Sequence, residues 1–151
     1  MNANEFPEND LILQDEVYLL VGSALEVLNV LGHGLREKTY ERAMIVELKS
    51  RSIQVEQQKS FPVFYKGVEI DTFIPDLIAM ARIVIDTKTI ERITDLEIGQ
   101  MLNYLKITGL SVGLILNFKR PKLEWRRVVL QTHKKDKNSR PFPSIRGSNP
   151  V

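Results

Sequence analysis

The spacing of apolar residues changes several times along the chain, and each spacing predicts a different element. Between residues 11 and 31 the apolar positions recur every three or four residues, which places them on one face of an amphipathic helix. Gly32 and Gly34 then end this helix and frame a tight connection. The stripe that we expect to face the core is Leu13, Val17, Leu20, Val21, Ala24, Leu25 and Leu28.

The next change of spacing is from helical to alternating. A second helix is expected from about residue 35 to residue 51, with an inward stripe of Tyr40, Ala43, Met44, Glu47 and Leu48. Alternating runs then predict four strands, at residues 53–57, 61–65, 68–80 and 83–88. Lys66-Gly67 supply a turn, whereas residues 79–82 contain no Gly, Asn or Asp and make a weak turn sequence.

The last part of the pattern predicts a helix followed by two strands. Thr94 or Asp95 can cap the helix, which ends at Gly109. Its inward residues are Ile98, Met101, Leu102 and Leu105. Residues 111–118 are almost continuously apolar, as in a buried central strand, and residues 123–130 form the final strand.

The order of these elements predicts the fold class. Two helices, four strands, a helix and two strands indicate an α/β (α+β) domain with a mixed central sheet flanked by helices. A chain of 151 residues with 43% hydrophobic residues is expected to form one domain, which we place at residues 11–130. Residues 1–10 are expected to be flexible, and the polar, proline-containing residues 131–151 are expected to be disordered.

Composition excludes several classes of protein. The absence of cysteine rules out disulfides, thiolate metal sites and a cysteine nucleophile. No apolar run is long enough to span a membrane, and the acidic start does not resemble a signal peptide, so we expect a cytoplasmic protein. The net charge is +2, but residues 131–151 hold five basic residues and one acid, which leaves residues 1–130 at about −2. Attraction to nucleic acid must therefore come from local patches or from the basic tail.

Candidate chemistry is concentrated in residues 73–88. Asp86 and Lys88 lie two residues apart on a predicted strand and therefore share a face. If residues 73–80 and 83–88 pair as a hairpin, Asp76 lies near Asp86. Two neighbouring carboxylates repel unless a proton or a cation intervenes, and a hard divalent ion suits oxygen ligands. The alternative is that Asp86 and Lys88 form a surface ion pair of little energetic value.

Polar residues on the flanking helices extend this group. Glu37 lies on the inward stripe of the second helix, although it also reads as a first-turn glutamate that the helix dipole favours. Gln100 and Tyr104 are four residues apart and share a face of the third helix. Tyr40 is expected to pack in the core with its hydroxyl group hydrogen-bonded, and His33 to be a solvated loop residue.

Several short motifs resemble a known family. Pro75-Asp76 and Asp86-Thr87-Lys88 are similar to the core motif of the PD-(D/E)XK nuclease superfamily, and Gly34-Leu-Arg-Glu37-Lys-Thr-Tyr40 resembles the signature of the GxxExxY protein family within it. The similarity covers about residues 12–130 and includes residues 64–67, 100–109 and 112–118. In one departure, Asp86 stands where the typical GxxExxY sequence has Glu, which withdraws the carboxylate by one methylene.

The resemblance implies a restriction-endonuclease-like core and a metal-dependent nuclease that acts on DNA or RNA. It implies that Asp76 and Asp86 hold Mg²⁺ or Mn²⁺, with the Thr87 carbonyl and with Glu37 through water. Lys88 would then orient the attacking water.

It further implies that Gln100 and Tyr104 contact the phosphate or fix Lys88. Two alternatives remain open from the sequence: a catalytically silent module that binds nucleic acid or a protein, and an interaction protein in which the acids are a relic. The oligomeric state is also open.

Overall fold

A five-stranded mixed sheet with helices on both faces forms the body of the protein. The computed structural model describes residues 12–131, and the sequence predictions for residues 1–10 and 132–151 fall outside the described residues. In these residues the helices are α1 (Gln14–Leu31), α2 (Glu37–Ser50) and α3 (Asp95–Thr108), and the strands are β1 (Val55–Glu56), β2 (Phe61–Tyr65), β3 (Val68–Phe73), β4 (Leu77–Ala79), β5 (Ile83–Lys88), β6 (Val112–Asn117) and β7 (Glu124–Val129).

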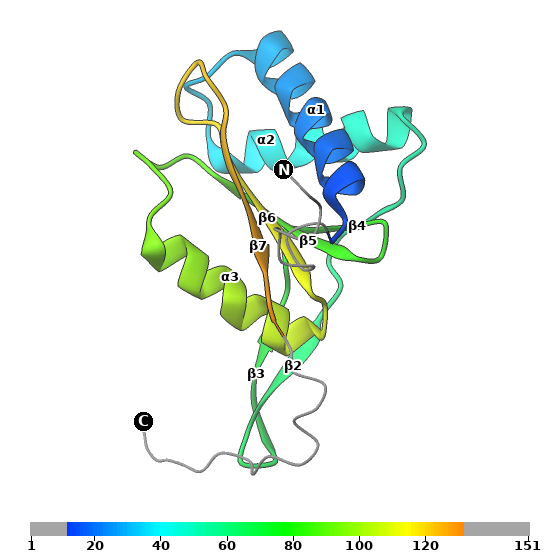
Figure 1. Cartoon of the computed structure of the whole chain (residues 1–151), viewed down its shortest axis with the longest axis vertical. Helices are drawn as coiled ribbons and strands as arrows, with labels where there is room; N and C mark the ends of the chain where they lie inside the picture. The colour runs from blue at the N-terminus through cyan, green and yellow to red at the C-terminus, as the bar shows by residue number, and fades with distance from the viewer. Residues whose placement is uncertain (1–11, 132–151) are drawn as a thin grey trace, which may run out of the picture.

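The sheet has the strand order β1-β4-β5-β6-β7, and β2 and β3 form a separate two-stranded hairpin (Figure 1). Strands β5 and β6 are parallel and are joined by the crossover helix α3, whereas the other pairs are antiparallel. Helices α1 and α2 cover one face and α3 covers the other (Figure 1). This arrangement confirms the predicted fold class. None of the helices in residues 12–131 is long and apolar enough to cross a membrane.

Alternation along β5 decides which side chains meet which helix. Ile83 and Ile85 belong to the core cluster under α1 and α2, and Val84 belongs to the cluster under α3. Since successive side chains of a strand point to opposite faces, Asp86 and Lys88 continue the side on which α3 lies. The shared face predicted for Asp86 and Lys88 is thus present.

The packing of α2 and α3 against the sheet depends on two particular contacts. Tyr40 is fully buried and stacks on Phe118 with ring centroids 4.5 Å apart, and its hydroxyl donates to the Gly32 carbonyl at 2.6 Å, as predicted. On the other face, a Cβ added at Gly113 would come within 2.6 Å of Met101 Cγ. The missing side chain at Gly113 therefore lets α3 approach β6 closely.

One predicted strand is wrong. Residues 68–80 were expected to form one strand, but they divide into β3 and β4, which belong to different sheets. The break falls at residues 74–76, where Pro75 has no N–H to donate to a ladder and restricts the residue before it. The first strand is also shorter than predicted, and Leu25 is 45% exposed rather than part of the core stripe of α1.

Two turns each contain a pair of consecutive residues with positive φ, and they differ in their strain. Lys66 and Gly67 both have positive φ, 50° and 81°, as a two-residue hairpin turn of type I′ requires. Met80 and Ala81 also have positive φ, 58° and 56°, and join β4 to β5. Positive φ is costly for residues with a Cβ, so the turn that lacks Gly, Asn and Asp forms with local strain.

Candidate active site

The break before β4 and the end of β5 bring two carboxylates to one cavity. Leu77 pairs with Ile85 in the antiparallel ladder, so Asp76 and Asp86 each lie one residue beyond that pair. Both line a cavity of about 100 Å³, together with Phe73, Pro75 and Tyr104 among others. A water molecule takes about 30 Å³ of liquid volume, so the cavity has room for a small ion with a few waters.

Asp76 is fixed in this position by the backbone of β5. Its Oδ2 accepts hydrogen bonds from the Thr87 backbone N–H at 3.1 Å and from the Thr87 hydroxyl at 3.2 Å. Thr87 is only 1% exposed, so both donors are held by the core. One oxygen of Asp76 is therefore used for positioning.

The surroundings of Asp86 disfavour its charged form and raise its pKa. Burial raises the pKa of Asp86 to about 7, and the nearby Asp76 carboxylate also raises it, while the Lys88 ammonium opposes the rise. Lys88 Nζ lies 3.2 Å from Asp86 Oδ2. At neutral pH Asp86 therefore retains a proton part of the time, because burial and the Asp76 charge together outweigh the Lys88 ammonium.

Helix α3 completes the surroundings of Lys88. Lys88 Nζ donates to Gln100 Oε1 at 3.2 Å. Burial lowers the pKa of Lys88, but the charge and hydrogen bond of Asp86, together with the Glu37 charge, outweigh this effect, so the pKa lies above its usual value and the amine stays charged. Tyr104 lines the same cavity and stacks on Phe73 at 4.1 Å between ring centroids. Burial, and then the Asp86 charge, raise the pKa of the Tyr104 hydroxyl.

Glu37 lies at the edge of this group rather than among the cavity-lining residues. It is the first residue of α2 and is exposed, and its Oε2 accepts a hydrogen bond from the Thr89 backbone N–H at 3.2 Å. Within residues 12–131 no group of three or more Asp, Glu or His side chains is arranged to hold a metal ion. The donors that fit a hard cation are thus the Asp76 and Asp86 carboxylates, and Glu37 is tied to the loop that follows Lys88.

Glu41 was not singled out by the sequence. It is only 9% exposed, and burial followed by the Asp76 charge raises its pKa. Lys38 forms an ion pair with Glu41 at 3.3 Å. Glu41 follows Glu37 by one helical turn, and a second acid at that spacing could have been noticed in the sequence.

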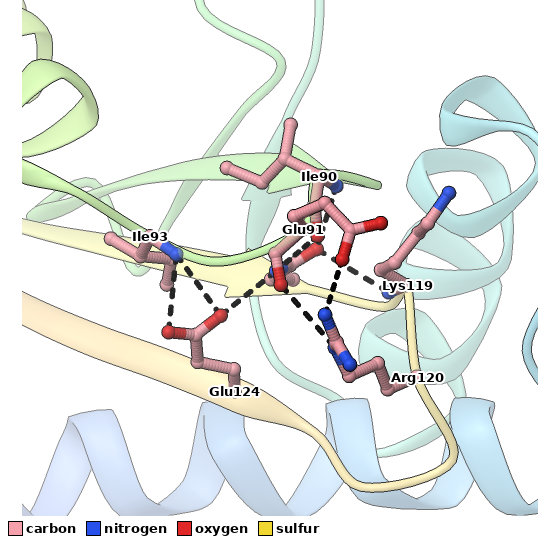
Figure 2. Close-up of polar contacts among 7 residues, drawn as sticks. Ile90, Glu91, Ile93, Lys119, Arg120 and Glu124 are labelled. Atoms are coloured by element: carbon pink, nitrogen blue, oxygen red, sulfur yellow. Dashed lines mark hydrogen bonds and ion pairs between the residues drawn. The ribbon is translucent and has the colours of Figure 1, made fainter.

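A hydrogen-bond network that the sequence did not reveal holds the loop between β5 and α3 (Figure 2). Asn117 is 2% exposed, and its side chain donates to the Ile90 carbonyl at 2.9 Å and accepts from the Ile90 N–H at 3.0 Å. The same amide donates to Glu124 Oε1 at 2.9 Å, and the Glu124 carboxylate accepts from the Ile93 N–H at 3.1 Å. Arg120 and Glu91 add an exposed ion pair. Asn117 and Glu124 therefore anchor the segment that connects Lys88 to the helix bearing Gln100.

The geometry of a carboxylate pair, a lysine and a glutamine at the end of a mixed sheet agrees with the family comparison. The chain belongs to the PD-(D/E)XK nuclease superfamily, because the model of that superfamily matches residues 14–128. Members of this superfamily generally use divalent metal ions such as Mg²⁺. No curated protein and no solved structure gives a significant match.

Proposed function

We propose that this protein is a metal-dependent nuclease of the GxxExxY family that hydrolyses phosphodiester bonds of DNA or RNA with Mg²⁺ or Mn²⁺. One observation carries the proposal: Asp76 and Asp86 share a cavity, and Lys88 lies 3.2 Å from Asp86, in a chain of the PD-(D/E)XK superfamily. We take residues 11–130 as the nuclease domain and the basic residues 131–151 as an addition that raises affinity for any nucleic acid.

In this proposal Asp76 and Asp86 would hold the divalent ion, together with the Thr87 carbonyl and with Glu37 through a water molecule. When bound, the ion lowers the pKa of a coordinated water and offsets charge on the phosphate. Lys88 keeps its proton at neutral pH, and its Nζ donates a hydrogen bond to the attacking water or to a phosphate oxygen.

Helix α3 supplies the remaining two groups. Gln100 accepts a hydrogen bond from Lys88 Nζ and restricts where the ammonium can point. The Tyr104 hydroxyl keeps its proton because its pKa is raised, so it can donate a hydrogen bond to the substrate phosphate. Neither residue exchanges a proton with the substrate in this scheme.

A second function is favoured because the Glu37 carboxylate already accepts a hydrogen bond within the protein. The carboxylate is hydrogen-bonded to the Thr89 amide, and no third acid completes a metal cluster in the described part of the chain. The alternative is therefore a catalytically silent module with the nuclease fold that binds nucleic acid or a protein partner.

A cleavage assay separates the two functions. Single-stranded and double-stranded DNA and RNA are incubated with Mg²⁺ or Mn²⁺ and with the wild type, Asp76→Asn, Lys88→Ala and the control Asp15→Asn. Asp15 is an exposed acid in the first turn of α1, so its substitution should leave cleavage unchanged. We expect the two site variants to lose roughly a hundredfold or more in rate, as when a group that stabilises transition-state charge is removed. Absence of wild-type cleavage on all substrates would favour the silent module, and equal cleavage by Asp76→Asn would show that the cleavage does not arise at this site.

A further inference from the structure

The β2–β3 hairpin (residues 61–73) exposes a cluster of apolar side chains to solvent. It stands apart from the five-stranded sheet and extends away from the body of the protein (Figure 1). Phe64, Tyr65, Val68 and Ile70 are between 59% and 63% exposed. An isolated hairpin is marginally stable in water, and a cluster of exposed apolar side chains marks a contact surface.

This surface is continuous with the candidate active site. Strand β3 ends at Phe73, which lines the cavity beside Asp76 and Asp86 and stacks on Tyr104. The cross-strand partner of Phe73 is Phe61. Aromatic residues therefore continue from the cavity along the hairpin toward Tyr65 near its turn. The five strand steps of β3 from Phe73 to Val68 span roughly 17 Å.

The charges on the hairpin restrict what it can bind. Lys59 Nζ lies 5.6 Å from the Phe61 ring centroid, and Lys66 Nζ lies 5.4 Å from the Tyr65 ring centroid. Lys59 precedes the hairpin and forms an ion pair with Glu56 at 3.8 Å. Residues 61–73 themselves hold one lysine, Lys66, and two acids, Glu69 and Asp71, and so carry a net charge of −1. A surface without net positive charge is poorly suited to a duplex, whose affinity comes mainly from neutralised phosphates. Aromatic faces combined with a few cations suit unpaired bases, which stack on such rings.

We propose that the β2–β3 hairpin binds single-stranded nucleic acid and leads the strand toward the cavity, with unpaired bases stacked on Tyr65, on the face of Phe61 and Phe73, and on Phe64, on the opposite face. The proposal rests on the proposed nuclease function because it names the class of substrate for the same site. Lys66 contacts a phosphate beside the stacked bases. A docking protein or a second copy of the chain would use the aliphatic side chains Val68 and Ile70 as much as the aromatic ones, and this difference supplies the test.

The test measures binding without turnover. Fluorescence anisotropy of labelled oligothymidine, and of a duplex of equal length, is recorded in EDTA with the wild type and with Phe64→Leu/Tyr65→Leu, which keeps apolar area but removes both rings. The control Val68→Ser/Ile70→Ser removes aliphatic surface of similar exposure. We expect the ring-deleted variant to bind oligothymidine at least about tenfold more weakly, since each stacked base contributes on that scale. The control should bind within about threefold of the wild type, and neither variant should change duplex binding.

Further variants and outcomes decide between this proposal and its rivals. Lys66→Ala should reduce the salt dependence of oligothymidine binding by the amount expected for about one phosphate contact. Thermal melts check that every variant folds. Unchanged oligothymidine affinity in the ring-deleted variant, or equal losses in both double variants, would overturn the hairpin proposal. A change confined to the oligomeric state, measured by light scattering, would also overturn it and assign the hairpin to contacts between copies.

The outcome is separable from that of the nuclease proposal. If ring-dependent binding is found in EDTA and no substrate is cleaved with Mn²⁺, the hairpin proposal holds and the nuclease proposal fails. If cleavage of single strands is unchanged in the ring-deleted variant, the nuclease proposal holds and the hairpin proposal fails.

Discussion

Among single residues, Asp86 is where the conflict between burial and charge is greatest. Its folded pKa is raised to about 7 from an ordinary value of 3.8, so the folded state binds the proton more tightly than the unfolded state does. Stability without metal must therefore fall as the pH rises from about 4 to about 7, and level off above that range.

This effect gives the first prediction. The new side chain in Asp86→Asn cannot ionise, so the variant should not lose stability over this pH range. It should be more stable than the wild type at pH 8 in EDTA, by up to about 4 kcal/mol when the whole pKa shift acts on stability. Urea denaturation of both proteins at several pH values measures the difference, and Asp15→Asn is the control that should keep the wild-type profile. Parallel profiles for Asp86→Asn and the wild type would show that Asp86 does not titrate in this range.

The second prediction concerns metal binding to the same residues. A divalent ion that binds only the folded state stabilises it by about 2.7 kcal/mol at a hundredfold excess over Kd. Because a proton competes for Asp86, the Mn²⁺-induced rise in Tm should be larger at pH 7.5 than at pH 5.5. Asp76→Asn and Asp86→Asn should lose most of the rise, whereas Lys88→Ala should keep much of it while melting lower than the wild type in EDTA. Differential scanning calorimetry with and without Mn²⁺ measures these shifts, and an equal rise in Asp86→Asn would contradict the assigned ligand.

At the scale of elements, the turn between β4 and β5 holds strain at the end of this strand pair that lies opposite the site. Ala81 is exposed and has a φ of 56°, which glycine adopts freely. We predict that Ala81→Gly raises the free energy of unfolding by about 1 kcal/mol. The matched control is Gly67→Ala in the turn between β2 and β3, where an added Cβ meets no atom within 4 Å and only backbone strain is introduced. This control should destabilise by a similar amount, and denaturant midpoints that move in the same direction for both variants would refute the explanation.

The loop between β5 and α3 gives the fourth prediction. Asn117→Asp replaces two hydrogen-bond donors by a carboxylate beside Glu124, so we expect a loss of about 2 to 3 kcal/mol and faster amide exchange at Ile90 and Ile93. Adding Glu124→Gln should restore part of the stability, because the new amide can donate to the new carboxylate.

The exposed pair nearby supplies a control for this network. Arg120→Ala removes the ion pair with Glu91 and should cost less than about 1 kcal/mol. Unchanged exchange at Ile90 in Asn117→Asp, measured by nuclear magnetic resonance, would mean that Asn117 is not a positioning residue for this loop.

Elements were predictable from the sequence where local spacing decides them. The candidate caps Thr94 and Asp95 and the Gly109 stop gave the bounds of α3 closely, and the proximity of Asp76 to Asp86 followed from two short runs joined by a tight turn. The break at Pro75 was missed because the apolar pattern continues through it.

Contacts between distant parts of the chain were harder to foresee. Asn117 and Ile90 are 27 residues apart, and the bond between Glu37 and the Thr89 amide spans 52 residues. Nothing in the local pattern of either segment indicates its partner, because these contacts depend on the packing of α2 and β6 around β5.

At the scale of the whole molecule, the charge is unevenly distributed between the domain and the basic segment that follows it. Residues 131–151 carry five basic residues and one acid, while residues 1–130 are slightly acidic. We predict that a protein ending at residue 131 binds nucleic acid more weakly and with a salt slope reduced by up to about four. Its melting temperature and its Mn²⁺ response should equal those of the full chain.

Binding isotherms at several salt concentrations test this prediction. A chain in which the five basic residues of this segment are replaced by glutamine is the matched control, since it keeps the length and loses the charge. A truncated protein with the full salt slope, or one that fails to fold, would show that the segment has another role.

The absence of a side chain at Gly113 has a consequence for how this protein can evolve. Met101 fills the space that a Cβ at Gly113 would need, and α3, which carries Met101, also carries Gln100 and Tyr104. A mutation to alanine would force the buried Met101 side chain to move, and any shift of α3 that follows would carry both polar side chains with it. Positions 101 and 113 are therefore free to change only as a pair, and a lineage that acquires a larger residue at 113 is expected to carry a smaller one at 101.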